Sequence, residues 1–165
     1  MSREMLVAGV TVDPVTKSPI VVLKDPGNRR ALPIWIGVLE ANAIVLALEK
    51  VELPRPMTHD LMKAVLETTG NSLRKVEITD IRENTYFASL HLEGNGVAYT
   101  VDSRPSDAIA LALRFGAPVV VAEGVLEKAV DIAVDAGDGE GGEGKDPWTE
   151  LLEKMDPGQF SKYKM

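Results

Sequence analysis

The chain has 165 residues, a length that favours one domain with a short tail and that can bury a core without metal or disulfide cross-links. It contains no cysteine, which excludes a disulfide framework and any thiolate zinc site and fits a reducing cytoplasm. The formal net charge is −7, and the body of the chain contains no stripe of basic residues, so constitutive DNA binding is not expected. The composition is compatible with binding of a small anion or of a transient nucleic-acid substrate.

The first part of the chain is predicted to contain three strands and two helices. Two β-rich runs, 5–13 and 19–25, are joined by a short turn and suit a hairpin, and 30–37 is typical of a third strand. The length and the Leu, Ala and Glu content of 38–50 predict a helix. A second helix is predicted within 55–70, where a glycine can end it.

The second part is predicted to open with an antiparallel meander, since tight turns separate its first three strands. The predicted elements are strands at 74–83, 85–93 and 97–103, an apolar helix within 101–114, a strand at 118–123 and a last helical turn or two at 125–130. The element order is therefore β-β-β-α-α-β-β-β-α-β-α. Because strands and helices are grouped rather than alternating, we expect an α+β fold, with mostly antiparallel strands in a mixed sheet and helices packed on it.

The composition changes near the end of the chain. We expect one domain over 1–130, a flexible acidic Gly-rich linker over 131–147 and a short amphipathic helix or tail over 148–165. No apolar run reaches the ~20 residues that a membrane-spanning helix needs, and the first residues lack the apolar core of a signal peptide. We therefore expect a cytoplasmic protein without a membrane partner.

Two predicted helix starts, RPMTHD at 55–60 and DSRPSD at 102–107, carry more polar side chains than capping requires. Thr58 and Ser103 are the predicted N-caps, and an Asp in the first turn of each helix complements the helix dipole. His59 and several other polar residues remain unexplained by capping. Polar helix starts also bind anions through their free N–H groups, so these segments are candidates for a functional site.

The residue types at the two helix starts suit chemistry on a phosphodiester. Carboxylates are hard oxygen ligands for Mg²⁺ or Mn²⁺, a metal ion can activate water, arginine pairs with phosphate, and histidine transfers protons near neutral pH. The candidate catalytic residues are His59, Asp60, Asp102, Arg104 and Asp107; the candidate anion-binding residues are Arg55, Thr58, Ser103 and Ser106; and the candidate metal ligands are Glu40, Asp102 and Asp107.

The same residues also suit a structural role. Caps, helix dipoles and ion pairs of Arg55 and Arg104 with Asp107 and Asp60 across the two helix starts would account for most of them. No D-x-D, H-x-H, Walker or G-x-S-x-G pattern is present, and only 5% of the residues are aromatic, with none beside a basic patch. These features favour a non-catalytic, oligomeric binding or regulatory module.

Three segments, LPIWIGVLEANAI (32–44), RPMTHDL (55–61) and VDSRPSDAIALALR (101–114), resemble the signature segments of the bifunctional nuclease domain family and occur in the family's order. The resemblance covers residues 5 to about 130 and implies a compact α+β fold, self-association and a nuclease that acts on DNA and RNA as transient substrates. The family's polar segments map onto the candidate residues named above. The tail departs from the family pattern, in which a short helical interaction module often follows the domain.

Overall fold

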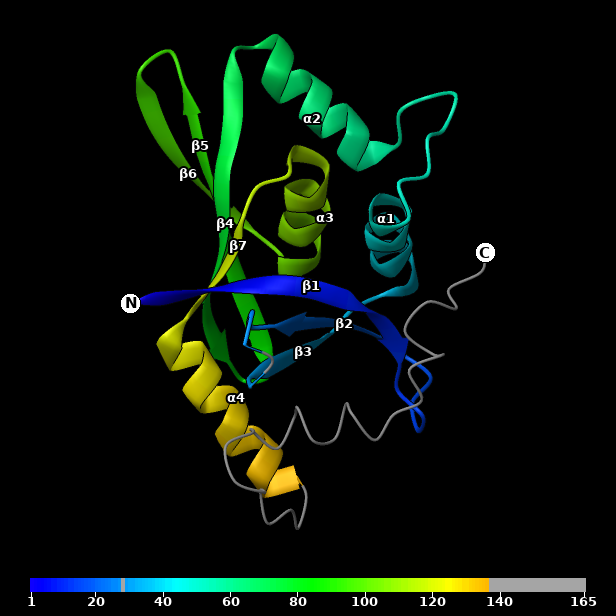
Figure 1. Cartoon of the computed structure of the whole chain (residues 1–165), viewed down its shortest axis with the longest axis vertical. Helices are drawn as coiled ribbons and strands as arrows, with labels where there is room; N and C mark the ends of the chain where they lie inside the picture. Colours follow the sequence, from blue (N-terminus) through cyan, green and yellow to red (C-terminus); the bar gives the residue numbers. More distant parts are fainter. Residues whose placement is uncertain (28, 137–165) are drawn as a thin grey trace.

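The structure, a computed structural model, describes residues 1–27 and 29–136 of the chain (Figure 1). The strands are β1 (Ser2–Val12), β2 (Pro19–Lys24), β3 (Ala31–Trp35), β4 (Asn71–Arg82), β5 (Thr85–Gly94), β6 (Val97–Ser103) and β7 (Val119–Ala122). The helices are α1 (Val38–Leu48), α2 (Thr58–Thr68), α3 (Pro105–Phe115) and α4 (Glu123–Ala136). The predicted α+β class and element order are confirmed.

The strands form one seven-stranded sheet in the order β3-β2-β1-β7-β4-β5-β6. The neighbouring strands pair antiparallel, except β4 and β7, which are parallel, so the sheet is mixed as predicted. In β5, Ala88, Leu90 and Leu92 are buried while the residues between them are partly exposed, which is the period-two pattern of a strand with one covered face.

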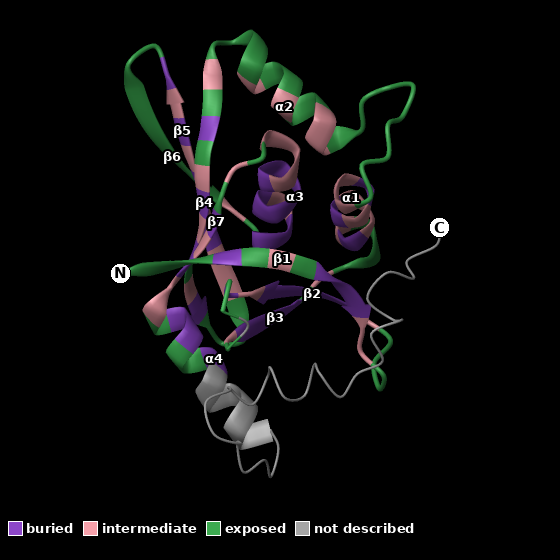
Figure 2. Cartoon of the chain, viewed as in Figure 1, coloured by how far each residue is buried: buried purple, intermediate pink, exposed green. Residues whose placement is uncertain are grey.

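Helices α1, α2 and α3 lie on the same side of the sheet, and α3 packs against both other helices and against β4 and β5 (Figure 1). Figure 2 shows α3 as the most buried of the three, whereas α2 is exposed or half-buried along its length. Residues 108–112 of α3 are buried, as its continuous apolar sequence predicts. Leu113 is an exception, because it is only partly covered.

The last helix is longer than the turn or two predicted at 125–130. Helix α4 runs to Ala136, past the boundary predicted at residue 130, because apolar residues continue at helical spacing through the segment VLEKAVDIAV. Residues 131–136, assigned to the linker, therefore belong to the last helix. The rest of the predicted linker and the predicted C-terminal helix over 148–165 lie outside the described residues.

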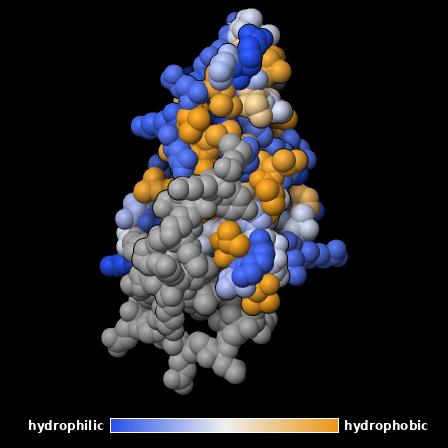
Figure 3. Space-filling model, turned by 90° about the vertical axis from the view of Figure 1, so that its right-hand side faces the viewer, coloured by the Kyte–Doolittle hydropathy of each residue, from blue (hydrophilic) through white to orange (hydrophobic). Residues whose placement is uncertain are grey.

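Exposed apolar side chains occur on the helical side of the molecule. Val38 and Leu39 of α1, and Leu53 and Met57 in the segment that follows it, are at least 42% exposed. Figure 3 shows apolar side chains interspersed with polar ones on this side. No helix in the described ranges has both the length and the apolar character that crossing a bilayer requires.

Candidate functional site

Three helix starts meet at one cluster of four side chains, which we call the helix-start cluster. Glu40 lies in the first turn of α1, His59 in that of α2 and Asp107 in that of α3, and Arg104 directly precedes α3. The His59 Nε2 lies 2.9 Å from the Asp107 Oδ1. Arg104 donates from Nε to the Asp107 Oδ2 at 2.8 Å and from Nη1 to the Glu40 Oε1 at 3.0 Å. Residues far apart in the sequence thus form one chain of contacts.

The local sequence explains how α2 and α3 begin, although the predicted N-caps Thr58 and Ser103 are wrong. Helix α2 starts one residue earlier and α3 one residue later than those caps require, with Met57 and Arg104 in the extended conformation at the N-cap position. Pro105 occupies the first helical position of α3, where its missing N–H costs nothing and where it disfavours a helical conformation in the preceding residue. Arg104 is therefore held outside the helix, in reach of both carboxylates.

The electrostatics of the cluster keep Asp107 ionised. Burial raises the pKa of the Asp107 carboxyl, but the hydrogen bonds from Arg104 and His59 outweigh burial, so that the pKa lies below its ordinary value. The carboxylates of Asp107 and Glu40 also raise the pKa of Arg104. The His59 side chain is 12% exposed and that of Arg104 is 63% exposed, so the guanidinium is the member of the cluster most open to solvent.

Gly37, at the N-cap of α1, makes room for the Glu40 carboxylate. A Cβ atom at position 37 would collide with that carboxylate, which turns back over its own helix start. The backbone of Gly37 has an ordinary φ of −78°, so the glycine meets a requirement for space rather than for conformation. The small residue therefore allows Glu40 to reach Arg104.

Asp60 lies in the first turn of α2, as His59 does, but it contacts a different partner. The Arg114 Nε donates to the Asp60 Oδ1 at 2.7 Å, and the Asp60 Oδ2 accepts the Met57 backbone N–H at 3.0 Å. Burial raises the pKa of Asp60, and these two contacts lower it below its ordinary value. The predicted pairing of Asp60 with Arg104 is wrong, because Arg114 ties the start of α2 to the end of α3.

Sequence reasoning overlooked Arg114, although the signal was present. An arginine in the apolar run DAIALALR lies seven residues after Asp107, and this spacing places both on one face of a helix. Its side chain is only 8% exposed, and it also donates from Nη1 to the Ala110 carbonyl. A nearly buried arginine needs such partners, so a carboxylate from a neighbouring element was to be expected.

The remaining predicted residues surround the cluster without joining its chain of contacts. Asp102 is exposed on β6, where it pairs in register with β5. The Ser103 hydroxyl donates to the next carbonyl at 2.9 Å. Arg55 is exposed before α2 and makes no ion pair within the described part of the chain, which corrects its predicted pairing with Asp107. Thr58 is exposed beside His59, and Ser106 is 6% exposed beneath Arg104.

The carboxylates do not come together as the ligands of a metal ion. Among residues 1–27 and 29–136, no group of three or more His, Cys, Asp or Glu side chains is placed to hold one. Glu40 and Asp107 both bind the guanidinium of Arg104, which occupies the space between them with a positive charge. In this arrangement the predicted set of Glu40, Asp102 and Asp107 does not fit Mg²⁺ or Mn²⁺, which prefer several oxygen ligands at one point.

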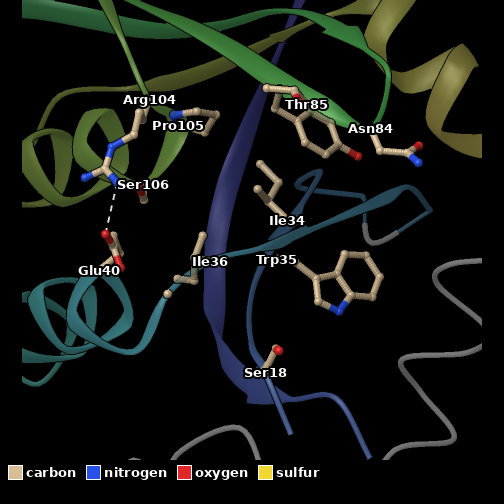
Figure 4. A pocket seen from close by; sticks show the side chains of 12 residues that line it. Ser18, Ile34, Trp35, Ile36, Glu40, Asn84, Thr85, Arg104, Pro105 and Ser106 are labelled. Atoms are coloured by element: carbon tan, nitrogen blue, oxygen red, sulfur yellow. Dashed lines mark hydrogen bonds and ion pairs between the residues drawn. The ribbon is translucent and has the colours of Figure 1, made fainter. Parts of the chain in front are cut away.

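Two cavities adjoin the cluster, and Arg104 and Glu40 line both of them. One, of about 300 Å³, lies among the three helix starts and is also lined by His59, Asp107 and Arg114. The other, of about 430 Å³, lies between the end of β3, the β4–β5 turn and the start of α3 (Figure 4). The cluster therefore has room for a ligand on two sides.

The chain belongs to a recognised family. The model of the bifunctional nuclease domain matches residues 21–133, so the chain belongs to the bifunctional nuclease domain family. This confirms the resemblance of the three sequence segments. The matched range contains all four residues of the helix-start cluster.

Individual relatives are similar over different lengths. An uncharacterized protein of Mycobacterium tuberculosis is 42% identical over 137 residues, covering 83% of this chain and 82% of that protein. Bifunctional nuclease 1 of Arabidopsis thaliana is 33% identical over 107 residues, or 62% of this chain and 33% of the plant protein. Bifunctional nuclease 1 of Oryza sativa subsp. japonica is 30% identical over 105 residues. The match with the plant proteins thus spans about a third of their length.

Proposed function

We propose that this chain hydrolyses phosphodiester bonds of DNA or RNA at the helix-start cluster. The observation that carries the proposal is the contact between His59 and Asp107, which joins two helix starts beside an exposed arginine and an open cavity. Membership in the bifunctional nuclease domain family and the names of the plant relatives support the choice of substrate.

In the proposed reaction, Asp107 orients His59. When the His59 Nε2 donates to Asp107, the neutral imidazole has Nδ1 left to accept a proton from an attacking water molecule. The carboxylate stabilises the imidazolium that forms as the water oxygen bonds to phosphorus, and the imidazolium returns the proton to the leaving oxygen as its P–O bond breaks. The Arg104 guanidinium suits the phosphate group, on which negative charge develops in the transition state. Divalent-metal dependence remains a prediction from the sequence, and no step is assigned to a metal ion.

The test pairs activity with stability in one variant. The change Asp107→Asn keeps the shape of the side chain and removes its charge, so we expect cleavage of single-stranded DNA and RNA to fall by at least ~10²-fold, as for the loss of a general acid–base system. Melting temperature is measured on the same preparation. Cleavage is assayed with Mg²⁺, with Mn²⁺ and with a chelator, which also tests the predicted cofactor.

Asp102→Asn is the matched control, because it removes an exposed carboxylate outside the contacts of the cluster. We expect it to cleave like the wild type. Loss of activity in Asp102→Asn, with full activity in Asp107→Asn, would refute the assignment to the helix-start cluster and would place the reaction at β6.

A second candidate function is a non-catalytic binding or regulatory module. It is favoured by the pairing of Arg104 with two carboxylates, since these contacts link α1 to α3 while His59 links α2 to α3. The cluster would then hold the three helices together or bind an anion. A wild-type protein that cleaves nothing under any metal condition, together with a lower Tm in Asp107→Asn, would select this function.

We also propose that two copies of the chain associate through β6. This strand forms one edge of the sheet, and its residues Val97, Tyr99 and Val101 are 43–49% exposed on the side where Leu90 and Leu92 of β5 are buried. An edge strand with an apolar row is a template for pairing with a second strand. Sedimentation at micromolar concentration should show a dimer that Val101→Lys dissociates. A monomeric wild type would refute this interface.

A further inference from the structure

The larger cavity beside the cluster, which we call the Trp35 pocket, has an exposed aromatic wall. Trp35 ends β3 and is 44% exposed, an unusual state for the largest apolar side chain. Its Nε1 donates to the Asp13 Oδ2 at 2.9 Å, a contact that restrains the orientation of the indole. An indole that is both exposed and restrained presents a fixed flat surface to the cavity.

Charged side chains line the side of the Trp35 pocket opposite the indole. Figure 4 shows Arg104 and Glu40 on one side of the cavity, Trp35 on the other and Ile36 between them. Among the described residues that line the pocket, these two paired residues are the charged ones, and the others are apolar or are polar and neutral. A ligand that fits such a pocket has a flat, uncharged part for the indole and an anionic part for the arginine.

Neutral polar side chains also line the pocket, where they can contact the edge of a flat ligand. Asn84 lies in the β4–β5 turn with a φ of 61°, in the left-handed region that asparagine tolerates better than most residues. Its amide offers both a donor and an acceptor. Burial raises the pKa of Tyr86 to about 12, so its phenol stays protonated at neutral pH and remains a donor. The pocket therefore offers hydrogen bonds without adding charge.

We propose that the Trp35 pocket binds one nucleobase of a single-stranded nucleic acid, stacked on Trp35, with the adjoining phosphate at Arg104. Base stacking on an aromatic side chain beside a cationic group is a general mode of single-strand binding. A paired base inside a duplex cannot enter such a pocket without leaving its stack, which selects single strands. The inference rests on the proposed function, because it names the substrate class of the same site.

Tertiary structure brings this arrangement about. Trp35, Tyr86 and Arg104 are distant in the sequence. They meet because β3, the β4–β5 turn and the start of α3 converge at one cavity. The cavity of about 430 Å³ falls within the ~300–1,000 Å³ of typical small-ligand pockets, which suits one nucleotide rather than a longer segment.

The test measures binding to the full chain in the presence of a chelator, with a short fluorescein-labelled single-stranded DNA as the probe. Trp35→Ala should weaken binding by roughly 5- to 150-fold, the range for loss of one stacked base. Trp35→Phe should recover most of the affinity, because it keeps a ring. Phe87→Ala, the matched control, removes the neighbouring aromatic of β5, which contacts Arg82 rather than the pocket, and should bind like the wild type.

Two further probes examine which part of the nucleic acid is bound. An oligonucleotide of the same length without bases should bind wild type and Trp35→Ala equally, and a duplex of the same sequence should bind more weakly than the single strand. A base-free strand that still distinguishes the two proteins would overturn the proposal. A mononucleotide that binds as tightly as the oligonucleotide would overturn the assignment to a strand.

A second measurement keeps the proposal testable if Trp35→Ala fails to fold. The chain has one other tryptophan, so Trp148→Phe leaves Trp35 as the single indole fluorophore. Stacking of a base should quench this fluorescence, and the base-free strand should not. Binding of the single strand without quenching would overturn the inference.

The result separates this inference from the proposed nuclease function. Binding that depends on Trp35 in a protein that cleaves nothing would support the pocket and refute the nuclease. Cleavage with the same KM in wild type and Trp35→Ala would support the nuclease and refute the pocket. A lower Tm with unchanged binding would also refute it, because Trp35 would then only connect β3 to Asp13.

Discussion

The change Ile109→Ala tests the central place of α3, and Leu113→Ala, one turn later in the same helix, is its matched control. Ile109 has no exposed surface, whereas Leu113 is only partly buried. Removing about three carbon atoms at ~0.8 kcal/mol each costs about 2.4 kcal/mol in transfer free energy. The cavity that remains raises the loss for Ile109→Ala to about 3–4 kcal/mol. The same truncation at Leu113 should cost about 1 kcal/mol, because water can fill the space.

Urea unfolding of both variants measures the two losses, and the m-values should stay equal to that of the wild type. Ile109→Val serves as a graded control with an expected loss of about 0.5–1.5 kcal/mol. Equal losses at the two positions, or a loss below about 0.5 kcal/mol for Ile109→Ala, would refute the described packing of α3 between the sheet and the other two helices.

Three further predictions concern the polar residues. The pKa of Asp107 is lowered on folding, so the stability that its charge contributes is present above its ordinary pKa of 3.8 and is lost as the pH falls through the lower folded value. The difference in unfolding free energy between wild type and Asp107→Asn should therefore shrink on acidification. A difference that stays constant with pH would contradict the assignment. Gly37→Ala should displace the Glu40 carboxylate at a cost below about 1 kcal/mol, since the ion pair it breaks is exposed, and a much larger loss in thermal unfolding would indicate backbone movement. A double-mutant cycle of Arg114→Met with Asp60→Asn should give a coupling of about 0.5–3 kcal/mol, and additive losses would show that this contact is not stabilising.

Local sequence patterns were sufficient to predict the type and order of the elements. A strand such as β5 follows from its period-two alternation, and α3 begins at Pro105 because proline suits the first turn of a helix and keeps the preceding residue extended. These signals depend only on neighbours along the chain. The same holds for the family resemblance, which rests on contiguous segments. The N-caps were missed by one residue, an error typical of helix boundaries.

Partners between distant segments were decided by the tertiary structure. The sequence showed that Asp60 and Asp107 lie in first turns, but the packing of α2 on α3 places Arg114 against Asp60 and leaves His59 for Asp107. The Trp35 pocket likewise needs β3 and the start of α3 side by side. Which side of α3 is covered also follows from packing, since its apolar sequence alone does not distinguish Ile109 from Leu113. Backbone propensity is local, whereas a contact depends on the sheet order and helix packing that bring two segments together.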